Sequence, residues 1–164
     1  MNEIEDLRSK LKGLYKVTDP LQKSRIKKAK KSFRDMVSLY FNHHVKLPET
    51  SKFRNFFYDN SSKLIKENRN MLFKAYRGAA KTTLISRLFM LYEMAVLGKK
   101  RNAVIVSATI NLSKKTLEFI KTELEENTKF IEDFNIDKGS KWTEDEIVFY
   151  ADKKAFKISV YGSG

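Results

Sequence analysis

The chain of 164 residues carries 33 Lys and Arg against 20 Asp and Glu, which gives a net charge of +13. Hydrophobic residues reach 41% and aromatic residues 12%, a composition that supports a buried core and excludes wholesale disorder. The chain has no Cys, which excludes disulfide bonds, thiolate metal sites and a Cys nucleophile. No apolar run is long enough to span a membrane. The strong positive charge indicates a polyanionic partner.

Residues 1–50 are predicted to form a basic, helical N-terminal segment. Asp19 and Pro20 are typical of a helix start, with Asp as the N-cap and Pro at the first helical position. The apolar residues that follow recur at spacings of mostly three and four, which predicts one amphipathic helix. These residues are Ile26, Ala29, Phe33, Met36, Val37 and Tyr40. A shorter helix is expected over residues 3–16.

Basic side chains are concentrated in this predicted helix. Seven occur between positions 23 and 34 with no acidic residue among them: Lys23, Arg25, Lys27, Lys28, Lys30, Lys31 and Arg34. Such a face can meet phosphates, whose contacts give affinity that is independent of base sequence. The alternative is a helix face that simply lies in solvent.

From residue 51 onward, short apolar strands alternate with amphipathic helices. The spacing predicts strands over 71–76 and 102–108, helices over 81–97 and from Asn111 or Ser113 to about Glu126, and a hairpin of strands 146–150 and 155–161. Strands that alternate with helices at this spacing favour an α/β fold with a parallel sheet.

One segment carries recognisable chemistry, the loop of residues 75–83 with the sequence AYRGAAKTT. It lies between a predicted strand and a predicted helix, where backbone N–H groups and a helix N-terminus converge on an anion. Lys81 fits the lysine that contacts β- and γ-phosphates, and Thr82 fits the hydroxyl that binds Mg²⁺. Against the pattern G-x-x-x-x-G-K-[ST], both glycines are replaced, by Ala75 and Ala80. The alternative is an ordinary turn whose Lys caps the helix.

Residues 77–84, RGAAKTTL, resemble the variant Walker A loop of the large terminase subunits of tailed bacteriophages, which often read Arg-Gly-x-x-Lys-[Ser/Thr]. The flanking segments resemble the same family in order along the chain. They are the aromatic segment 53–58, the strand and turn 104–109, and the stretches 141–142 and 158–164. The resemblance covers roughly residues 50–164 and implies a P-loop NTPase of the RecA/ASCE type.

The resemblance also implies roles for individual residues. Lys81 and Arg77 would be catalytic, with Arg77 acting in cis on the γ-phosphate and Thr82 holding Mg²⁺. The ATP-binding residues would be Gly78, Ala79, Ala80, Lys81, Thr82, Thr83 and Tyr58. The family often reads adenine with an upstream Gln, but no Gln occurs between 48 and 75, so Tyr58 or Phe57 is the candidate for stacking on the base. The alternatives are a salt bridge for Arg77 and a place in the core for Tyr58.

After residue 109, the sequence contains no apolar run that ends in a pair of acidic residues. A P-loop ATPase needs further carboxylates at the end of a later apolar strand, and Asp145-Glu146 instead begins a predicted strand. We therefore expect residues 51–164 to be the first part of an ATPase domain, without the Walker B strand and the nuclease domain. Such a fragment alone is expected to be inactive.

The resemblance implies a motor that uses ATP and Mg²⁺ to package double-stranded DNA into procapsids. The implied partners are DNA, the small terminase subunit and the portal protein, with a homo-oligomer in the assembled state, in the host cytoplasm and away from membranes. The alternatives are a helicase-type translocase and a non-catalytic DNA-binding or assembly module.

The two histidines, His43 and His44, are expected near a helix C-terminus rather than in a metal site, since no Cys is present. The acidic run of Glu123, Glu125 and Glu126 is expected to lie on a solvated helix face.

Overall fold

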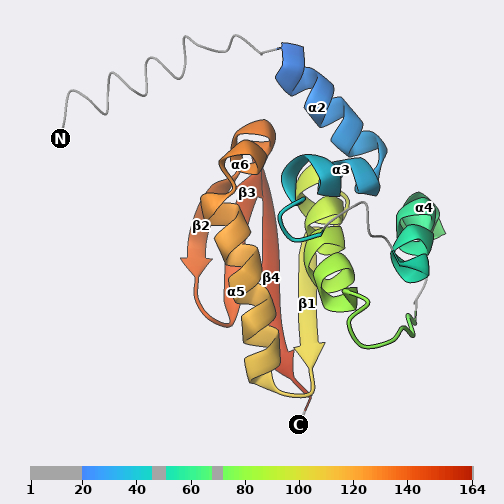
Figure 1. The fold of residues 1–164 in the computed structure, drawn as a ribbon. Helices are drawn as coiled ribbons and strands as arrows, with labels where there is room; N and C mark the ends of the chain where they lie inside the picture. Colours follow the sequence, from blue (N-terminus) through green and yellow to red (C-terminus); the bar gives the residue numbers. More distant parts are fainter. Residues whose placement is uncertain (1–19, 46–50, 68–71, 164) are drawn as a thin grey trace, which may run out of the picture.

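The computed structural model of the protein describes residues 20–45, 51–67 and 72–163. A mixed sheet of four strands is covered on one face by helices (Figure 1). The elements are α2 (Pro20–Lys31), α3 (Phe33–Tyr40), α4 (Lys52–Glu67), η1 (Thr82–Phe89), η2 (Tyr92–Val96), β1 (Asn102–Ser107), α5 (Ile110–Glu126), α6 (Thr128–Phe134), β2 (Asp137–Trp142), β3 (Glu146–Ala151) and β4 (Lys154–Gly162). Within these described residues, no helix combines the length and apolar character needed to cross a bilayer.

The sheet confirms the α/β class but is not a parallel sheet. Its strand order is β1-β4-β3-β2, and only β1 and β4 run parallel, with Val104 opposite Ser159. The predicted hairpin is present as β3 and β4, closed by a turn in which Asp152 and Lys153 have φ of 45° and 65°. Two left-handed residues match the twist of a hairpin, and this tight turn forces the two strands to be antiparallel. The strand β2, which the sequence pattern did not predict, adds antiparallel to β3.

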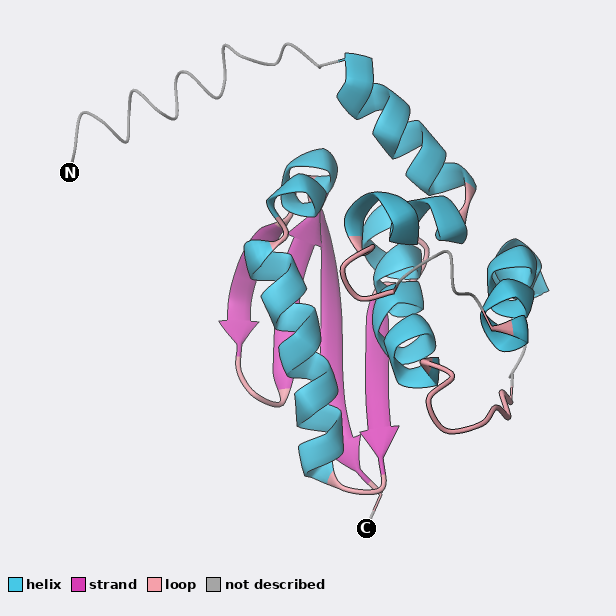
Figure 2. Cartoon of the chain, in the orientation of Figure 1, coloured by secondary structure: helices cyan, strands magenta, loops and turns pink. Residues whose placement is uncertain are grey.

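Helices cover one face of the sheet, as Figure 2 shows. Helix α5 packs on β4 and β1, η1 packs beside α5, and η2 contacts β3. The strands direct Ile147, Phe149 and Ile158 into this interface, where all three are fully buried. The opposite face carries Val104 and Val106, which are 62% and 59% exposed. The fold is therefore two layers thick over the described residues.

The strand predicted over 71–76 is wrong for the residues that the structure describes. Residues 72–76 have no strand hydrogen bonding, and Met71 lies outside the described residues. The apolar side chain of Phe73 is used differently, because its ring packs against Phe57 of α4 with a centroid distance of 5.3 Å. The apolar Phe73, which contributed to the strand prediction, thus packs in an aromatic contact with Phe57.

The predicted helix over 81–97 is present, but most of it is wound as π-helix in η1 and η2. The N–H group of Leu97 donates to the carbonyl of Tyr92, five residues earlier, at 2.9 Å. Gly98 follows the end of the helix with a left-handed φ of 63°, which glycine adopts without strain. The buried side of this π-wound helix is broad and includes Phe89, Met94 and Val96.

The single N-terminal helix predicted from Pro20 is divided at Ser32 into α2 and α3. Ser32 has extended backbone angles, and its Oγ accepts a hydrogen bond from the N–H group of Asp35 at 3.3 Å, so it is the N-cap of α3. The apolar stripe is buried in both helices, from Ala29 to Tyr40. Asp19 and the helix predicted over 3–16 lie outside the described residues.

Phe33 lies at the centre of an aromatic cluster that joins the N-terminal helices to the rest of the core. Its ring contacts Phe57 of α4 and both Phe89 and Tyr92 of the π-wound helix, with centroid distances of 5.7, 5.2 and 5.4 Å. All of these side chains belong to one buried core that also includes the sheet. The predicted segments 1–50 and 51–164 therefore share a core where both are described.

A partly buried ion pair also links the N-terminal helices to α6. The Arg25 guanidinium donates to both carboxylate oxygens of Asp133, at 2.9 and 2.8 Å, and the Tyr40 hydroxyl donates to the same carboxylate at 2.7 Å. Burial alone would raise the pKa of Asp133, but these hydrogen bonds outweigh burial and hold the pKa below its ordinary value.

Replacing Asp133 tests this link. Asp133→Asn removes the charge that faces Arg25 and weakens the hydrogen bond from Tyr40, so we expect a loss of about 2–3 kcal/mol in the free energy of unfolding. Urea denaturation followed by circular dichroism measures the change. Glu132→Gln, at an exposed position one residue earlier on the same helix, is the matched control and should change stability by less than about 0.5 kcal/mol.

The same pair of variants predicts a pH dependence. The folded-state pKa of Asp133 is lower than its unfolded value, so its carboxylate stabilises the fold above about pH 4, and this contribution is lost as the pH falls through the folded pKa. Asp133→Asn should therefore lose less stability than the parent protein on acidification. Parallel curves for the two proteins would contradict the assignment.

Candidate phosphate-binding loop

The loop of residues 75–83 turns sharply before the helix that starts at Lys81. Gly78 has φ of 89° and Ala80 has φ of 57°, so two residues adopt left-handed angles within three positions. A residue with a Cβ atom pays a cost for this conformation, whereas Gly does not. Ala79 between them is buried, with 1% of its surface exposed. The backbone is thus turned so that the exposed Gly78 is at the tip.

Backbone donors are left available at this turn. The N–H group of Ala79 donates to the carbonyl of Tyr76 at 3.3 Å. The N–H groups of Gly78, Ala80 and Lys81 have no acceptor among the residues that the structure describes. Unpaired N–H groups at the first turn of a helix carry the positive end of the helix dipole and favour an anion. These N–H groups are therefore available to an acceptor from outside the described residues.

Lys81 lies where the sequence predicts it, at the first helical position. Its Nζ donates to the carbonyl of Ala75 at 2.5 Å and to that of Tyr76 at 2.9 Å. These two contacts fold the ammonium group back across the start of the loop, beside the turn at Gly78. A phosphate at the turn would compete with two carbonyls for this ammonium group.

The other predicted ligands surround the same turn. Arg77 and Thr82 are exposed and Thr83 is half-buried. Arg77 forms no ion pair with any described residue, so the alternative of a salt bridge that holds the loop has no support in this part of the chain. The side chains assigned to Mg²⁺ and to the γ-phosphate, Thr82 and Arg77, are therefore accessible to solvent.

The topology puts this loop at the carboxyl end of the parallel strands. The helix of residues 81–97 runs directly into β1 through a short connection, so its N-terminus lies at the end where β1 stops at Ser107. Helix α5 begins at Ile110 at that same end, and β4, parallel to β1, also ends there (Figure 1). In α/β folds, ligands bind at the carboxyl ends of parallel strands.

Tyr58 is placed differently from the other predicted ligands. It lies in α4, 4% exposed, with its ring 5.7 Å from Phe33 and under the guanidinium of Arg34 at 4.8 Å. Its hydroxyl has no hydrogen-bond partner among the described residues. Stacking on a base would require this ring to leave the aromatic cluster. Tyr58 and Phe57 are both buried, in agreement with the alternative that these rings belong to the core.

The basic run of the N-terminal segment divides into two groups. Arg25 pairs with Asp133, and Arg34 pairs with Asp59 at 2.9 Å. The five lysines of α2 are all exposed, and none forms an ion pair with a described acidic residue: Lys23, Lys27, Lys28, Lys30 and Lys31. Both arginines are therefore engaged in ion pairs within the fold, and the lysines form a positive surface, called here the α2 lysine surface.

The acidic run also differs from the expectation of a solvated face, because Glu123 is buried. Its partners are His43 and His44, some eighty residues earlier in the chain. The position of the histidines after α3 is as predicted, but no spacing in the sequence indicates their contact with Glu123.

No family model, no curated protein and no solved structure is significantly similar to the chain.

The left-handed angle of Ala80 gives a direct test of the loop geometry. Ala80→Gly removes the steric cost of a Cβ atom at φ of 57°. Glycine also makes the unfolded chain more flexible, which offsets part of this gain. We expect a net increase of about 0.5–1 kcal/mol in the free energy of unfolding. Ala79→Gly, at the buried neighbour, should instead lose about 1 kcal/mol. Thermal and urea denaturation of both variants measure these changes. Destabilisation by Ala80→Gly would show that the turn is built differently.

Proposed function

We propose that residues 75–83 bind the phosphates of ATP with Mg²⁺, and that the chain is the N-terminal ATPase region of a DNA-packaging motor of the large terminase type. The observation that supports this most is the combination of unpaired N–H groups at Gly78, Ala80 and Lys81 with the Lys81 ammonium group beside the same turn. Backbone donors, a helix N-terminus and a lysine are the three components that hold nucleotide phosphates in a P-loop.

The proposed chemistry assigns one task to each side chain. Lys81 would leave the carbonyls of Ala75 and Tyr76 and contact the β- and γ-phosphates, while the Thr82 hydroxyl would bind Mg²⁺. The Arg77 guanidinium, exposed at the tip of the loop, would neutralise charge that develops on the γ-phosphate during transfer. Thr83 would add a further donor to the phosphates.

Turnover needs a carboxylate that orients the attacking water. Neither Lys81 nor Thr82 contacts a carboxylate in the described part of the chain, and Glu146 lies at the start of β3. We therefore assign nucleotide binding to this chain, and hydrolysis to a larger motor subunit that would supply the acidic residues.

The α2 lysine surface is the proposed contact for double-stranded DNA. Lys23, Lys27 and Lys31 follow one another at intervals of four residues, so they form a row along one face of α2. A row of unpaired ammonium groups matches the regular phosphates of a duplex and binds with little dependence on base sequence. DNA binding and nucleotide binding are thus assigned to opposite parts of the chain.

A second candidate is a non-catalytic DNA-binding or assembly module. It is favoured by the absence of a strand over residues 72–76, since a loop that is not fixed to a sheet gives a less rigid phosphate site. This candidate retains the α2 lysine surface and predicts no nucleotide binding. A helicase-type translocase would share the loop chemistry and differ in the acidic residues that complete the site.

The loop is tested by replacing its lysine. Lys81→Ala should weaken binding of a fluorescent ATP analogue with Mg²⁺ by about 10–100-fold, because it removes charge-assisted hydrogen bonds to phosphate. Fluorescence anisotropy of the purified 164-residue chain measures the affinity.

Lys74→Ala is the matched control, because it removes an exposed lysine just before the loop and should leave the affinity unchanged. Equal affinities of Lys81→Ala and the parent protein would contradict the proposal. No nucleotide binding by the parent, with DNA binding retained, would favour the non-catalytic module.

The DNA contact is tested on the α2 lysine surface. Lys23→Ala, Lys27→Ala and Lys31→Ala combined should weaken binding to a DNA duplex and make the slope of log affinity against log salt concentration shallower by about 2–3. The control combines Lys52→Ala, Lys63→Ala and Lys66→Ala on α4, which removes the same charge from three other exposed positions. Equal losses in the two triple variants would show that net charge alone, and not the α2 lysine surface, determines binding.

A further inference from the structure

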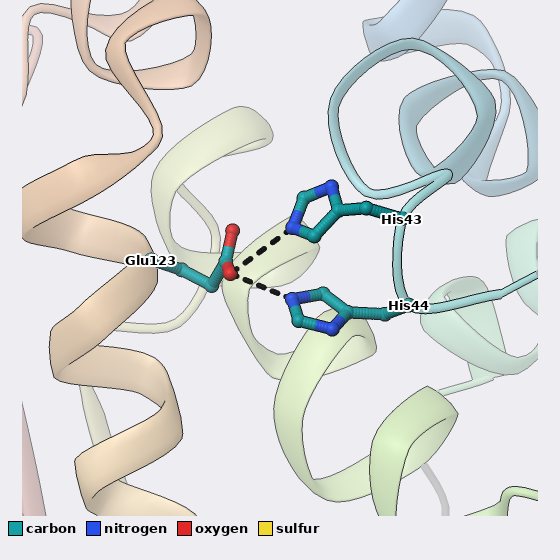
Figure 3. A group of neighbouring side chains, drawn as sticks. All are labelled: His43, His44 and Glu123. Atoms are coloured by element: carbon teal, nitrogen blue, oxygen red, sulfur yellow. Dashed lines mark hydrogen bonds and ion pairs between the residues drawn. The ribbon is translucent and has the colours of Figure 1, made fainter.

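Two adjacent histidines and a buried glutamate converge between α3 and α5. The Nε2 atoms of His43 and His44 lie 3.2 and 2.6 Å from the same oxygen of Glu123, Oε1. Figure 3 shows both rings directed at this carboxylate from the turn that follows α3. The candidate ligand atoms of the three residues all lie within 4.8 Å of one another. The three side chains therefore meet at one point from two separate elements.

The turn after α3 is fixed so that both rings face α5. Phe41 and Val45 on either side of the histidines are buried, which anchors the backbone at both ends. The His44 ring packs on Phe119 of α5 with a centroid distance of 4.4 Å, and the two imidazole rings lie 4.0 Å apart. The convergence is thus held by packing and does not depend on the polar contacts alone.

Glu123 is held by its second oxygen. The Asn127 side-chain amide donates to Glu123 Oε2 at 2.8 Å, and the same amide nitrogen donates to the carbonyl of Tyr40 at the end of α3. This leaves Oε1 as the atom that faces the histidines. Ligands in metal sites are commonly oriented in this way by an outer hydrogen bond.

The charges of the cluster also favour a cation. Burial would raise the pKa of Glu123, but hydrogen bonds from His44, Asn127 and His43 outweigh burial and keep the pKa below its ordinary value. The Glu123 side chain is 7% exposed, so its carboxylate is almost excluded from water. Each imidazole Nε2 that faces the carboxylate either carries a proton that it donates or, in the other tautomer, offers a lone pair to a metal ion.

We propose that His43, His44 and Glu123 form a binding site for a divalent transition-metal ion, with Zn²⁺ as the ion that fits best. Two imidazole nitrogens and one carboxylate oxygen are a donor set that suits Zn²⁺ and disfavours Mg²⁺ and Ca²⁺, which prefer oxygen ligands alone. Bonds of about 2.0–2.1 Å at tetrahedral angles place neighbouring ligand atoms about 3.3 Å apart. The distance from His43 to Glu123 already matches this value, and the distance from His44 must lengthen.

The ion would cross-link the N-terminal helices to α5. His43 is half-exposed and His44 is 25% exposed, so a fourth position on the ion opens toward solvent and is completed by water. The ion would bind the folded arrangement and not the unfolded chain, which places its two ligand segments eighty residues apart in sequence. Binding would therefore stabilise the packing of α3 on α5.

The composition of the chain makes the site easy to test. The chain has only two His and no Cys, so a transition metal has no other imidazole or thiolate to bind. We would strip the full 164-residue chain with a chelator and titrate it with Co²⁺ as a spectroscopic substitute for Zn²⁺, without nucleotide. The expected result is one equivalent bound with visible ligand-field absorption, displaced by Zn²⁺, and a melting temperature that rises with Zn²⁺.

Three variants decide whether these residues are the ligands. His43→Asn, at the more exposed position and therefore least disruptive to the fold, should weaken Co²⁺ affinity by at least about tenfold. Glu123→Gln should do the same, and Glu126→Gln, an exposed glutamate three residues later on α5, should bind as the parent does. Unchanged Co²⁺ affinity in His43→Asn, or no absorption and no rise in melting temperature with the parent protein, would overturn the proposal and leave a proton-bridged cluster only.

Discussion

The contact between Phe57 and the two rings that flank the candidate loop determines where that loop lies. Phe73 precedes the loop and Phe89 follows it, and both rings pack on Phe57 at 5.3 and 5.1 Å. Phe33 in turn holds Phe57 and Phe89 from the N-terminal helices. In this structure an aromatic cluster performs the anchoring that a strand would give in a sheet-bound loop. The geometry of Lys81 therefore depends on residues of α3 and α4 that never contact it.

Two buried carboxylates define how the N-terminal helices dock. The Asp133 carboxylate accepts hydrogen bonds from Arg25 of α2 and Tyr40 of α3. The Glu123 carboxylate faces the two histidines of the turn after α3. Apolar packing alone tolerates sliding, but a buried charge that loses its partner costs several kcal/mol. These two contacts accordingly fix one position of the N-terminal helices along α5 and α6, whereas the apolar stripe alone would allow several positions. The exposed lysines of the α2 lysine surface lie outside this arrangement.

The elements that the sequence predicted well are those whose signal is local. The strand at 102–107, helix α5 and the hairpin follow from apolar spacing and turn residues. The break at Ser32 also has a local signal, a Ser followed three residues later by Asp35, although the apolar stripe masks it. The wrong prediction of a strand at residues 72–76 has a different cause. A strand forms only beside a neighbouring strand, and a local sequence pattern does not indicate whether that neighbour is present. Lys81 could be placed at a helix start from sequence, whereas the meeting of His43 with Glu123 depends on tertiary packing.

The uncovered face of the sheet gives the protein two opposing tendencies in solution. Val104, Val106 and Tyr161 form an apolar surface that attracts other copies, while the net charge of +13 repels them. Salt screens the repulsion, with a Debye length of about 10 Å at 0.1 M, and leaves the apolar attraction in place. We therefore expect the tendency of the protein to associate with itself to increase with ionic strength.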